Sequence, residues 1–430
     1  MNIQKISSEN RLFQIAIGVS IIWVIAQIIL IIYFWGVPQG SDMGTYIKIA
    51  QDCFEMGEWY PTTHNIYSQY IWAPGFVNYL ILQLKIFGTV NLNSIFNLLM
   101  NIIILYEVYL LGKHFFSNTI ALLAVILFCL LYSNTMVVLS AGTELPFLFL
   151  SLSGLCLVFF SKSKIVNFIF AGILFALANW IRPLVIIFVI AALTYMFLKK
   201  QNILSYLSLL LSIIIIVLII GFSTYNKIGY FVYQSTTSGV NLIMTANDKA
   251  YGGVMSHVFK DSTSTMYINE VEKLTFIERD SIYKSRAIEW IKENPVRFAF
   301  LYVKKIAGLY IEDSWADRPI LGGDGFIGKY ATGEISKSEF ILRAFHMLLG
   351  SIAYYIVIIL FIISLWINRR KLLSERSIVL LIFILGTAIT ILFAVTPRYH
   401  HPFMFVMVLY AAWGLVALEK HKVKHKNNYD

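Results

Sequence analysis

The chain has 430 residues, of which 58% are hydrophobic and only 13% are charged. Because a soluble domain carries about a quarter charged residues, this composition excludes an ordinary soluble protein. The net charge of +10 does not indicate a nucleic-acid partner, since the basic residues lie at the ends of apolar segments rather than in one patch. Three cysteines without a pairing pattern predict neither a disulfide framework nor a zinc site.

Ten apolar segments follow one another along the chain. A membrane-spanning helix needs about 20 apolar residues, because every backbone polar group must be paired inside the segment. The segments are 12–35, 92–112, 119–139, 144–160, 165–181, 183–198, 203–222, 346–367, 376–395 and 402–419. The first is too long for the core of a signal peptide, so we interpret it as a retained span. The sequence therefore predicts an all-α polytopic membrane protein.

The basic residues of the short loops fall on one side of these spans. They are Lys113, Lys162, Lys164, Lys199, Lys200, Arg369 to Lys371, Arg376 and the tail from Lys420 to Lys426. Positively charged short loops stay in the cytoplasm, so we expect both termini inside a cell membrane. Three regions result: an N-terminal transmembrane module 1–222 with a first external loop 36–91, a long extracytoplasmic region 223–345, and C-terminal helices with a basic cytoplasmic tail, 346–430.

Each external region contains a predicted membrane-surface helix. Residues 74–87 are apolar but include Lys85, and a full crossing there would invert every later loop. In the helix from Pro295, the apolar residues Phe298, Leu301, Tyr302 and Leu309 are expected to oppose Lys304 and Lys305, as in helices that lie at a membrane surface.

The first external loop opens with a predicted helix from Ser41 to about Met56, and Asp42 lies at its start. At 3.6 residues per turn Asp42 shares a face with Tyr46 and Cys53. A carboxylate beside apolar and aromatic residues at a membrane surface indicates a functional site. The alternative is that Asp42 only stabilises the helix N-terminus.

Several short motifs in this order resemble those of the GT-C glycosyltransferases, in particular the protein mannosyltransferase and aminoarabinose transferase branch. They are Asp42-x3-Tyr46, Tyr60-Pro61, Trp72-Ala73-Pro74-Gly75, Gly142-Thr143-Glu144-Leu145-Pro146, Asn179-Trp180-Ile181-Arg182-Pro183, Asn294-Pro295 with Lys304-Lys305, and Pro397-Arg398-Tyr399. The resemblance implies a GT-C-like bundle of about 10 transmembrane helices. It also implies a sugar transfer outside the cytoplasm, from a polyprenyl-phosphate donor to an envelope acceptor such as a lipid, wall polymer or protein. The acidic residue that this family requires in its first loop corresponds to Asp42.

One departure from the family pattern concerns metal binding. Some relatives use an Asp-x-Asp pair for a divalent metal, and here position 44 is glycine. We therefore expect no required cofactor, although a divalent metal remains an open alternative.

A single carboxylate suits the chemistry that the resemblance implies. A lipid-linked phosphate leaves as a stable anion, so it needs electrostatic stabilisation rather than a proton donor. Glycoside hydrolysis differs, because there a second carboxyl group must protonate the leaving oxygen. We predict that Asp42 is the base for the acceptor and that one displacement inverts the anomeric centre.

The predicted substrate-binding residues are Arg398, Tyr399, Glu144, Arg182, Tyr46 and Lys85. Arginine forks match phosphate oxygens, but Arg182 and Arg398 are also placed to reach lipid headgroups. Lys304 and Lys305 are further phosphate contacts or headgroup lysines. Glu144 is either a second acid or a solvated residue at a helix start. His400 and His401 are interpreted as polar boundary residues, and Asp313 and Asp317 receive no role.

Two other classes of protein remain as alternatives: a multi-pass transporter or lipid flippase, and a non-catalytic assembly factor. A transporter predicts a continuous polar path between the two faces. The enzyme hypothesis predicts that Asp42, Glu144 and Arg398 converge on the external side. The external position of the charges and the length of the two external regions favour the enzyme.

Overall fold

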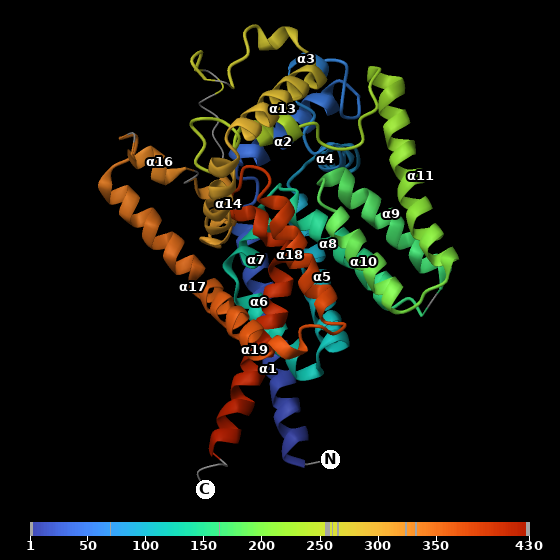
Figure 1. Cartoon of the computed structure of the whole chain (residues 1–430), viewed down its shortest axis with the longest axis vertical. Helices are drawn as coiled ribbons and strands as arrows, with labels where there is room; N and C mark the ends of the chain where they lie inside the picture. The colour runs from blue at the N-terminus through green and yellow to red at the C-terminus, as the bar shows by residue number, and fades with distance from the viewer. Residues whose placement is uncertain are drawn as a thin grey trace.

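The computed structural model of the chain describes residues 3–426 except 69, 163, 254–258, 260, 265, 323–324 and 332. The described residues form helices and loops, with one isolated β-bridge between Gly253 and Val395. Figure 1 shows both termini at one end of the molecule and α2, α3 and α13 at the other. The expectation of an all-α polytopic protein is confirmed.

Each of the ten predicted spans coincides with a helical segment. Five segments are long and apolar enough to cross a bilayer: α1 (Ile3–Tyr33), α5 (Asn93–Phe115), α11 (Ile203–Ile228), α17 (Lys337–Ile367), and η6 (Pro397–Phe403) continued by α19 (Met404–Lys426). A sixth is the pair α6 (Asn118–Leu130) and α7 (Tyr132–Met136) with η1 (Val137–Leu139), bent by 71°. Four shorter apolar helices are α8 (Glu144–Phe159), α9 (Ile165–Ile181), α10 (Ile186–Leu198) and α18 (Ser377–Thr390).

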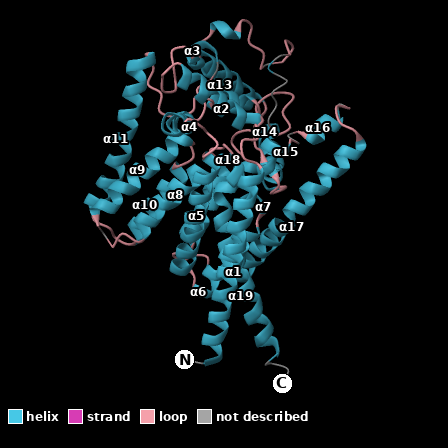
Figure 2. Ribbon diagram, turned by 180° about the vertical axis from the view of Figure 1, so that it is seen from behind, coloured by secondary structure: helices cyan, strands magenta, loops and turns pink. Residues whose placement is uncertain are grey.

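These helices are arranged around a buried central helix. In α19 every residue from Met404 to Trp413 is buried, and the helix packs against α17 and α6. The helices α8 to α11 pack together on one side of the molecule (Figure 1). On the other side, the outer half of α17 leans away from the bundle in both views (Figures 1 and 2).

The bend in the sixth span is supported by asparagines of α5. Asn93, Asn97 and Asn101 are buried at intervals of four residues, so they lie on one helix face. Their side-chain amides donate to backbone carbonyls around the bend: Asn93 to Ser140 at 3.1 Å, Asn97 to Ser140 at 2.8 Å, and Asn101 to Asn134 at 2.7 Å. Carbonyls freed inside a membrane must find internal partners, and these amides supply them.

The two predicted external regions lie at the end of the molecule opposite the termini (Figure 1). The first contains α2 (Ser41–Glu55), α3 (Asn65–Ser68) and α4 (Pro74–Phe87). The second contains α12 (Ser238–Ile243), η3 (Val271–Lys273), α13 (Phe276–Glu293), α14 (Pro295–Tyr310), η4 (Trp315–Asp317), α15 (Arg318–Leu321) and α16 (Phe326–Ala331). Helix α13 begins with a capping box between Thr275 and Glu278, which satisfies backbone donors at both ends of that pair.

The surface helix α14 is oriented differently from the prediction. Leu301, Lys305 and Leu309 are buried on one face, and Val296, Phe300, Val303 and Ile306 are exposed. Lys305 lies one turn from both leucines, and residues four apart share a helix face. The interpretation of Lys305 as an opposing surface lysine is therefore wrong.

Candidate functional site

The centre of the candidate site is an ion pair between Asp42 and Arg398. The Arg398 guanidinium on η6 donates to the Asp42 carboxylate in the first turn of α2. A second nitrogen of the same guanidinium lies 3.8 Å from the sulfur of Met43. The first external loop and the entrance to the last span are therefore joined through two predicted residues.

A second ion pair adjoins the first. Arg182 donates to Glu144 at 2.8 Å, and the Nε atom of Arg398 lies 3.8 Å from the same carboxylate oxygen. The exposed fractions of the side chains are 35% for Asp42, 18% for Arg398, 11% for Arg182 and 3% for Glu144. Charges of opposite sign thus alternate along the contacts from Asp42 to Arg398, Glu144 and Arg182. The predicted convergence of Asp42, Glu144 and Arg398 is observed.

Two tyrosines complete this group. The Tyr399 ring lies 4.8 Å from the guanidinium of Arg182 and 5.4 Å from that of Arg398, and such contacts favour the cations. Tyr46 is half-buried on α2, with its ring 5.7 Å from that of Phe76. Burial, and next the negative charge of Asp42, raise the pKa of Tyr46 above its ordinary value. Its hydroxyl therefore stays protonated and can donate a hydrogen bond.

The start of α2 is held in place by Gln39. Its side chain donates to the Leu139 carbonyl at 2.8 Å and accepts from the Ala141 backbone at 2.8 Å. This segment directly precedes α8, which carries Glu144 in its first turn. The backbone N–H of Gly40 also donates to the Pro319 carbonyl at 2.7 Å. Asp42 and Glu144 are therefore brought together by anchored backbone rather than by their own charges, which are of like sign.

Position 44 has no room for a side chain, so it needs glycine. A Cβ atom added to Gly44 would lie 2.3 Å from the Gln39 carbonyl oxygen, far inside van der Waals contact. An Asp-x-Asp pair starting at Asp42 is thus incompatible with this backbone. Over the described ranges, no group of three or more His, Cys, Asp or Glu residues is placed to hold a metal ion. The residues present do not fit the metal site of the Asp-x-Asp relatives.

Two of the predicted motifs contact each other beside Arg182. A Cβ atom on Gly75 would lie 2.7 Å from the backbone of Trp180, so only glycine allows α4 to approach the end of α9 this closely. The Ala73 backbone, one residue before Pro74, adopts a left-handed conformation with φ of 40°. These features fix the end of α9 from which Arg182 extends.

Lys85 does not join the charged group. Its side chain is exposed on α4, and its ammonium lies 4.5 Å from the Trp59 ring. Lys304 is exposed on α14 and Lys305 is buried in the same helix. Of the predicted substrate-binding set, Tyr46, Glu144, Arg182, Arg398 and Tyr399 converge with Asp42.

A network of buried acids next to this group was missed by the sequence analysis. Asp313 accepts from the Ser133 backbone at 3.1 Å and lies 3.3 Å from His400, and Asp317 accepts from Tyr132 at 2.6 Å and contacts His346 at 2.6 Å. Glu312 pairs with Arg318. The available signal was the density of acids and a tryptophan within 312–318, which in sequence also suits an exposed loop.

The two histidines at the entrance to the last span are buried rather than at a polar boundary. His400 is 0% and His401 is 1% exposed. His400 stacks on Tyr354 and Tyr310, with ring centroids 5.1 and 5.8 Å away. Its two ring nitrogens approach the Leu309 carbonyl at 2.8 Å and Asp313 at 3.3 Å. The boundary interpretation is wrong because η6 turns inward at this point.

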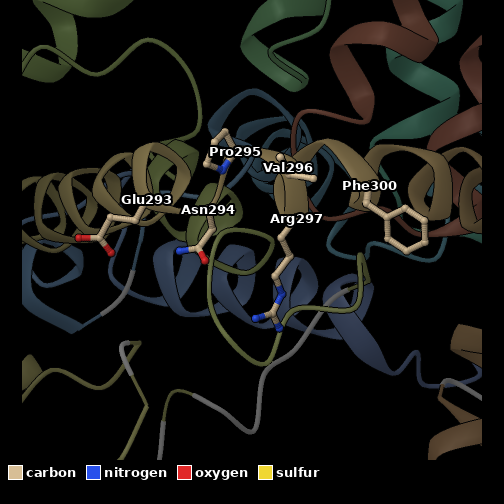
Figure 3. Close-up of a pocket in the computed structure, with 6 residues that line it drawn as sticks. All are labelled: Glu293, Asn294, Pro295, Val296, Arg297 and Phe300. Atoms are coloured by element: carbon tan, nitrogen blue, oxygen red, sulfur yellow. The ribbon is translucent and has the colours of Figure 1, made fainter.

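A surface hollow lies apart from this group, where α13 meets α14. Figure 3 shows it lined by Glu293, Asn294, Pro295, Val296, Arg297 and Phe300. A guanidinium nitrogen of Arg297 lies 3.7 Å from a carboxylate oxygen of Asp248. This ion pair is exposed and therefore contributes little to stability. The hollow is about 20 Å along α14 from Leu309, at 1.5 Å per residue. None of the residues that line this hollow belongs to the charged group around Arg398.

Comparisons with known proteins concern the fold and one part of the sequence. Residues 73–225 match the dolichyl-phosphate-mannose-protein mannosyltransferase family. The fold is similar to the oligosaccharyltransferase of Archaeoglobus fulgidus in the apo form (TM-score 0.51, 12% identity, 96% of this chain and 52% of that chain). It is also similar to AglB from the same organism in complex with an inhibitory peptide and a dolichol-phosphate (TM-score 0.50, 13% identity, 96% and 52%).

A looser likeness is found to ArnT from Cupriavidus metallidurans bound to undecaprenyl phosphate (TM-score 0.38, 10% identity, 95% and 77%), and it is too weak to support a structural argument. A search of curated proteins finds no match. The chain spans about half the length of the archaeal oligosaccharyltransferases.

Fold and site together define a polytopic membrane protein with a GT-C-like fold, whose charged group lies at the ends of the spans opposite the termini. Residues 73–225 carry the mannosyltransferase family's sequence pattern, and the fold is shared with the archaeal oligosaccharyltransferases. Both findings support the resemblance to the GT-C glycosyltransferases that the sequence shows.

Proposed function

We propose that this protein transfers a monosaccharide from a polyprenyl-phosphate donor to a cell-envelope acceptor on the extracytoplasmic face. The observation that carries the proposal is the Asp42–Arg398 pair, which joins a carboxylate and a phosphate-binding cation at one point. Arg182 and Glu144 extend this group inward. Both arginines keep their charge at any physiological pH, so the site is permanently suited to a phosphate anion.

In the proposed reaction the donor phosphate binds the guanidinium forks. The acceptor oxygen forms a bond to the anomeric carbon while the bond from that carbon to the phosphate oxygen breaks. The polyprenyl phosphate leaves as an anion that the arginines stabilise. The acceptor proton moves to the Asp42 carboxylate and from there to water. A single displacement of this kind inverts the anomeric centre.

The ion pair gives this reaction an order. While Arg398 is bound to Asp42, the guanidinium occupies one oxygen of the carboxylate. A donor phosphate competes with Asp42 for the same guanidinium. Donor binding therefore frees the base, and we infer that the acceptor is deprotonated only when the donor is in place.

The charge that stabilises the leaving phosphate is assigned to Arg182 and Arg398 rather than to a divalent metal. Two features support this assignment: the steric conflict at Gly44 and the pairing of Asp42 with arginine. The acceptor remains an envelope lipid, wall polymer or protein, and the membrane lipids surround the spans.

A transporter or flippase is the second candidate function, and one observation favours it. Glu107 is 5% exposed within α5, where it accepts from Ser153 at 2.5 Å. An ionisable residue inside a membrane is a functional candidate by default, and the sequence analysis overlooked it. The polar residues above it, Asn93, Asn97 and Asn101, donate to the bent span, so their role is structural and they form no transport path by themselves.

The test uses purified full-length protein in nanodiscs with a panel of polyprenyl-phosphate sugars, including polyprenyl-phosphate mannose, and envelope lipid and peptide acceptors. Wild type is expected to transfer sugar. Asp42→Asn is expected to bind donor at least as well, because Arg398 loses its competitor, and to transfer roughly 100-fold more slowly or worse. Asp52→Asn, an exposed aspartate of the same helix, should behave as wild type.

Full activity of Asp42→Asn removes Asp42 from the mechanism. Transbilayer movement of the lipid by wild type, without any product in the whole panel, supports the flippase and overturns the proposal.

A further inference from the structure

His401 is a buried polar residue whose ring nitrogens form no hydrogen bond with the described residues. It is 1% exposed, and neither ring nitrogen has a hydrogen-bond partner within the described part of the chain. It belongs to the 3-10 helix η6, three residues after Arg398. Residues three apart are aligned in a 3-10 helix, so His401 and Arg398 lie along one edge. His401 therefore lies further inside the protein than Arg398 along this edge.

Trp315 presents a second unused donor next to His401. The two rings are 5.4 Å apart in an edge-to-face arrangement. Trp315 is 4% exposed, and its indole N–H also finds no acceptor among the described residues. The tryptophan is held rigidly, because Asp313 and Asp317 on either side are bonded to Ser133 and Tyr132.

These two side chains adjoin the charged group from the inside. His401 lies within electrostatic reach of Arg182 and Asp313. Two further buried polar atoms without partners are the second carboxylate oxygen of Glu144 and the hydroxyl of Ser140, and both lie within 2.8 Å of the Cβ position of Gly142. Buried donors and acceptors without partners are thus present beside the arginines that are assigned to the phosphate.

Buried polar groups without partners are unfavourable for folding, and native proteins contain few of them. A group of such atoms beside a site is explained when a ligand provides the missing hydrogen bonds. We propose that His401 and Trp315 form the sugar-binding floor of the transferase site and hydrogen-bond the hydroxyl groups of the donor sugar. This inference rests on the proposed function, because the sugar enters attached to the phosphate that the arginines bind.

The chemistry of the two residues fits adjacent hydroxyl groups. A neutral imidazole has one donor and one acceptor nitrogen, and an indole has one donor. An aromatic ring also packs well against the apolar face of a sugar. A hydroxyl group that donates to His401 can at the same time accept from Trp315.

The floor favours a neutral sugar over an amino sugar. A sugar ammonium needs a free carboxylate, but the Glu144 carboxylate is already paired with Arg182 through its other oxygen, and the remaining buried acids nearby are engaged. Glu312 pairs with Arg318, Asp313 is bonded to Ser133 and His400, and Asp317 is bonded to Tyr132 and His346. With two arginines above it, an additional cation at the floor meets repulsion. A hexose carrying only hydroxyl groups meets none.

The test compares bare polyprenyl phosphate with polyprenyl-phosphate mannose as ligands of the full-length protein in nanodiscs. Trp315→Phe removes the N–H donor together with part of the ring, and His401→Leu removes both ring nitrogens at similar volume. Both variants should keep the affinity of wild type for bare polyprenyl phosphate within about twofold, and should lose about tenfold in affinity for the mannose-bearing lipid and in kcat/KM. His401→Gln, which keeps one donor and one acceptor, should recover most of this loss.

Thermal unfolding separates this role from a structural one. Because His401→Leu removes an unsatisfied buried group at similar volume, this variant should unfold at a temperature no lower than wild type. Trp315→Phe leaves a small cavity and should lower the unfolding temperature modestly. Two matched controls should leave the affinities for both ligands unchanged. One is His114→Gln, in the last turn of α5, where His114 is bonded to Tyr195. The other is Trp366→Phe at an exposed position.

Wild-type binding of the mannose-bearing lipid by Trp315→Phe and His401→Leu overturns the sugar floor while leaving the proposed function intact. An equal loss for both ligands, accompanied by a lower unfolding temperature, shows a structural role and overturns it as well. If wild type itself neither binds nor transfers any lipid-linked sugar, the proposed function fails. An amino sugar donor that binds as tightly as mannose contradicts the preference for a neutral sugar.

Discussion

Asp42 and Arg398 are 356 positions apart in the chain and form an ion pair. One residue follows the first span and the other opens the last. The pair exists only when η6 and α19 are packed in the bundle. The candidate site therefore needs both the first and the last span. Both residues meet on the side of the molecule that the short basic loops predict to be external.

The first prediction concerns Arg398. Arg398→Gln should weaken the binding of bare polyprenyl phosphate by about tenfold or more, since hydrogen bonds to charged groups contribute about 1.5–3 kcal/mol. Arg398→Lys should fall between this variant and wild type, because an ammonium keeps the charge but not the fork. Titration calorimetry in nanodiscs measures both. Arg369→Gln, at the opposite end of α17 in η5 (Arg369–Lys371), is the control, and an unchanged affinity in Arg398→Gln contradicts the assignment.

The second prediction concerns the buried pair of Glu144 and Arg182. Glu144→Gln leaves two arginines with one carboxylate in a largely buried place, and it should lower the free energy of unfolding by about 3 kcal/mol. The double variant Glu144→Gln with Arg182→Met should recover at least half of that loss, because no unpaired charge remains on Arg182. Denaturant unfolding in detergent measures the coupling.

A surface pair provides the comparison. Glu375 and Lys199 are 2.6 Å apart but exposed, and Glu375→Gln should change the stability by less than about 1 kcal/mol. Equal losses for Glu144→Gln and Glu375→Gln would show that Glu144 is solvated, as the sequence alternative held.

The third prediction concerns pH and Lys305. Burial lowers the pKa of Lys305 from 10.5 to about 8, because the ammonium is removed from water without a carboxylate partner. Between pH 8 and 10.5 the unfolded chain binds this proton and the folded chain does not, so stability rises with pH through that window. At pH 7 the folded protein therefore carries the full destabilisation.

Lys305→Met should accordingly stabilise the protein at pH 7 by about 3 kcal/mol. The gain should shrink above pH 8 and disappear above pH 10.5. Lys304→Met, an exposed neighbour, should show no gain at any pH. Unfolding midpoints measured from pH 7 to 10.5 test the slope, and a pH-independent gain would show that packing rather than charge is responsible.

The fourth prediction concerns orientation in the membrane. In a background without the three native cysteines, Ser338→Cys and Ser374→Cys place exposed thiols at the two ends of the bundle. Ser338 lies at the start of α17, near α16, and Ser374 follows η5. A membrane-impermeant maleimide applied to intact cells should label Ser338→Cys and spare Ser374→Cys. The reverse pattern would place Asp42 in the cytoplasm and exclude transfer on the outer face.

The helices were largely predictable from the sequence, because the bilayer imposes a local requirement on length and apolarity. Their internal details were not. The bend of 71° after Leu130 depends on amides from α5, and the sequence of 119–139 alone contains no proline to mark it. The predicted orientation of α14 is wrong because Lys305 lies on the same helix face as Leu301 and Leu309, although its neighbour in sequence, Lys304, is exposed.

By itself the sequence determined which segments are long and apolar enough to cross the membrane and which side the basic loops favour. It also placed Asp42, Glu144, Arg182 and Arg398 at the ends of spans opposite the basic loops. These properties follow from composition and charge within short segments. Only the tertiary structure decided that the four side chains meet, that Lys85 stands apart, and that His400, His401 and the acids of 312–317 are buried beside them. The physical reason is that ion pairing and burial depend on contacts between residues far apart in the chain, and no local pattern encodes which distant surface will cover a polar residue.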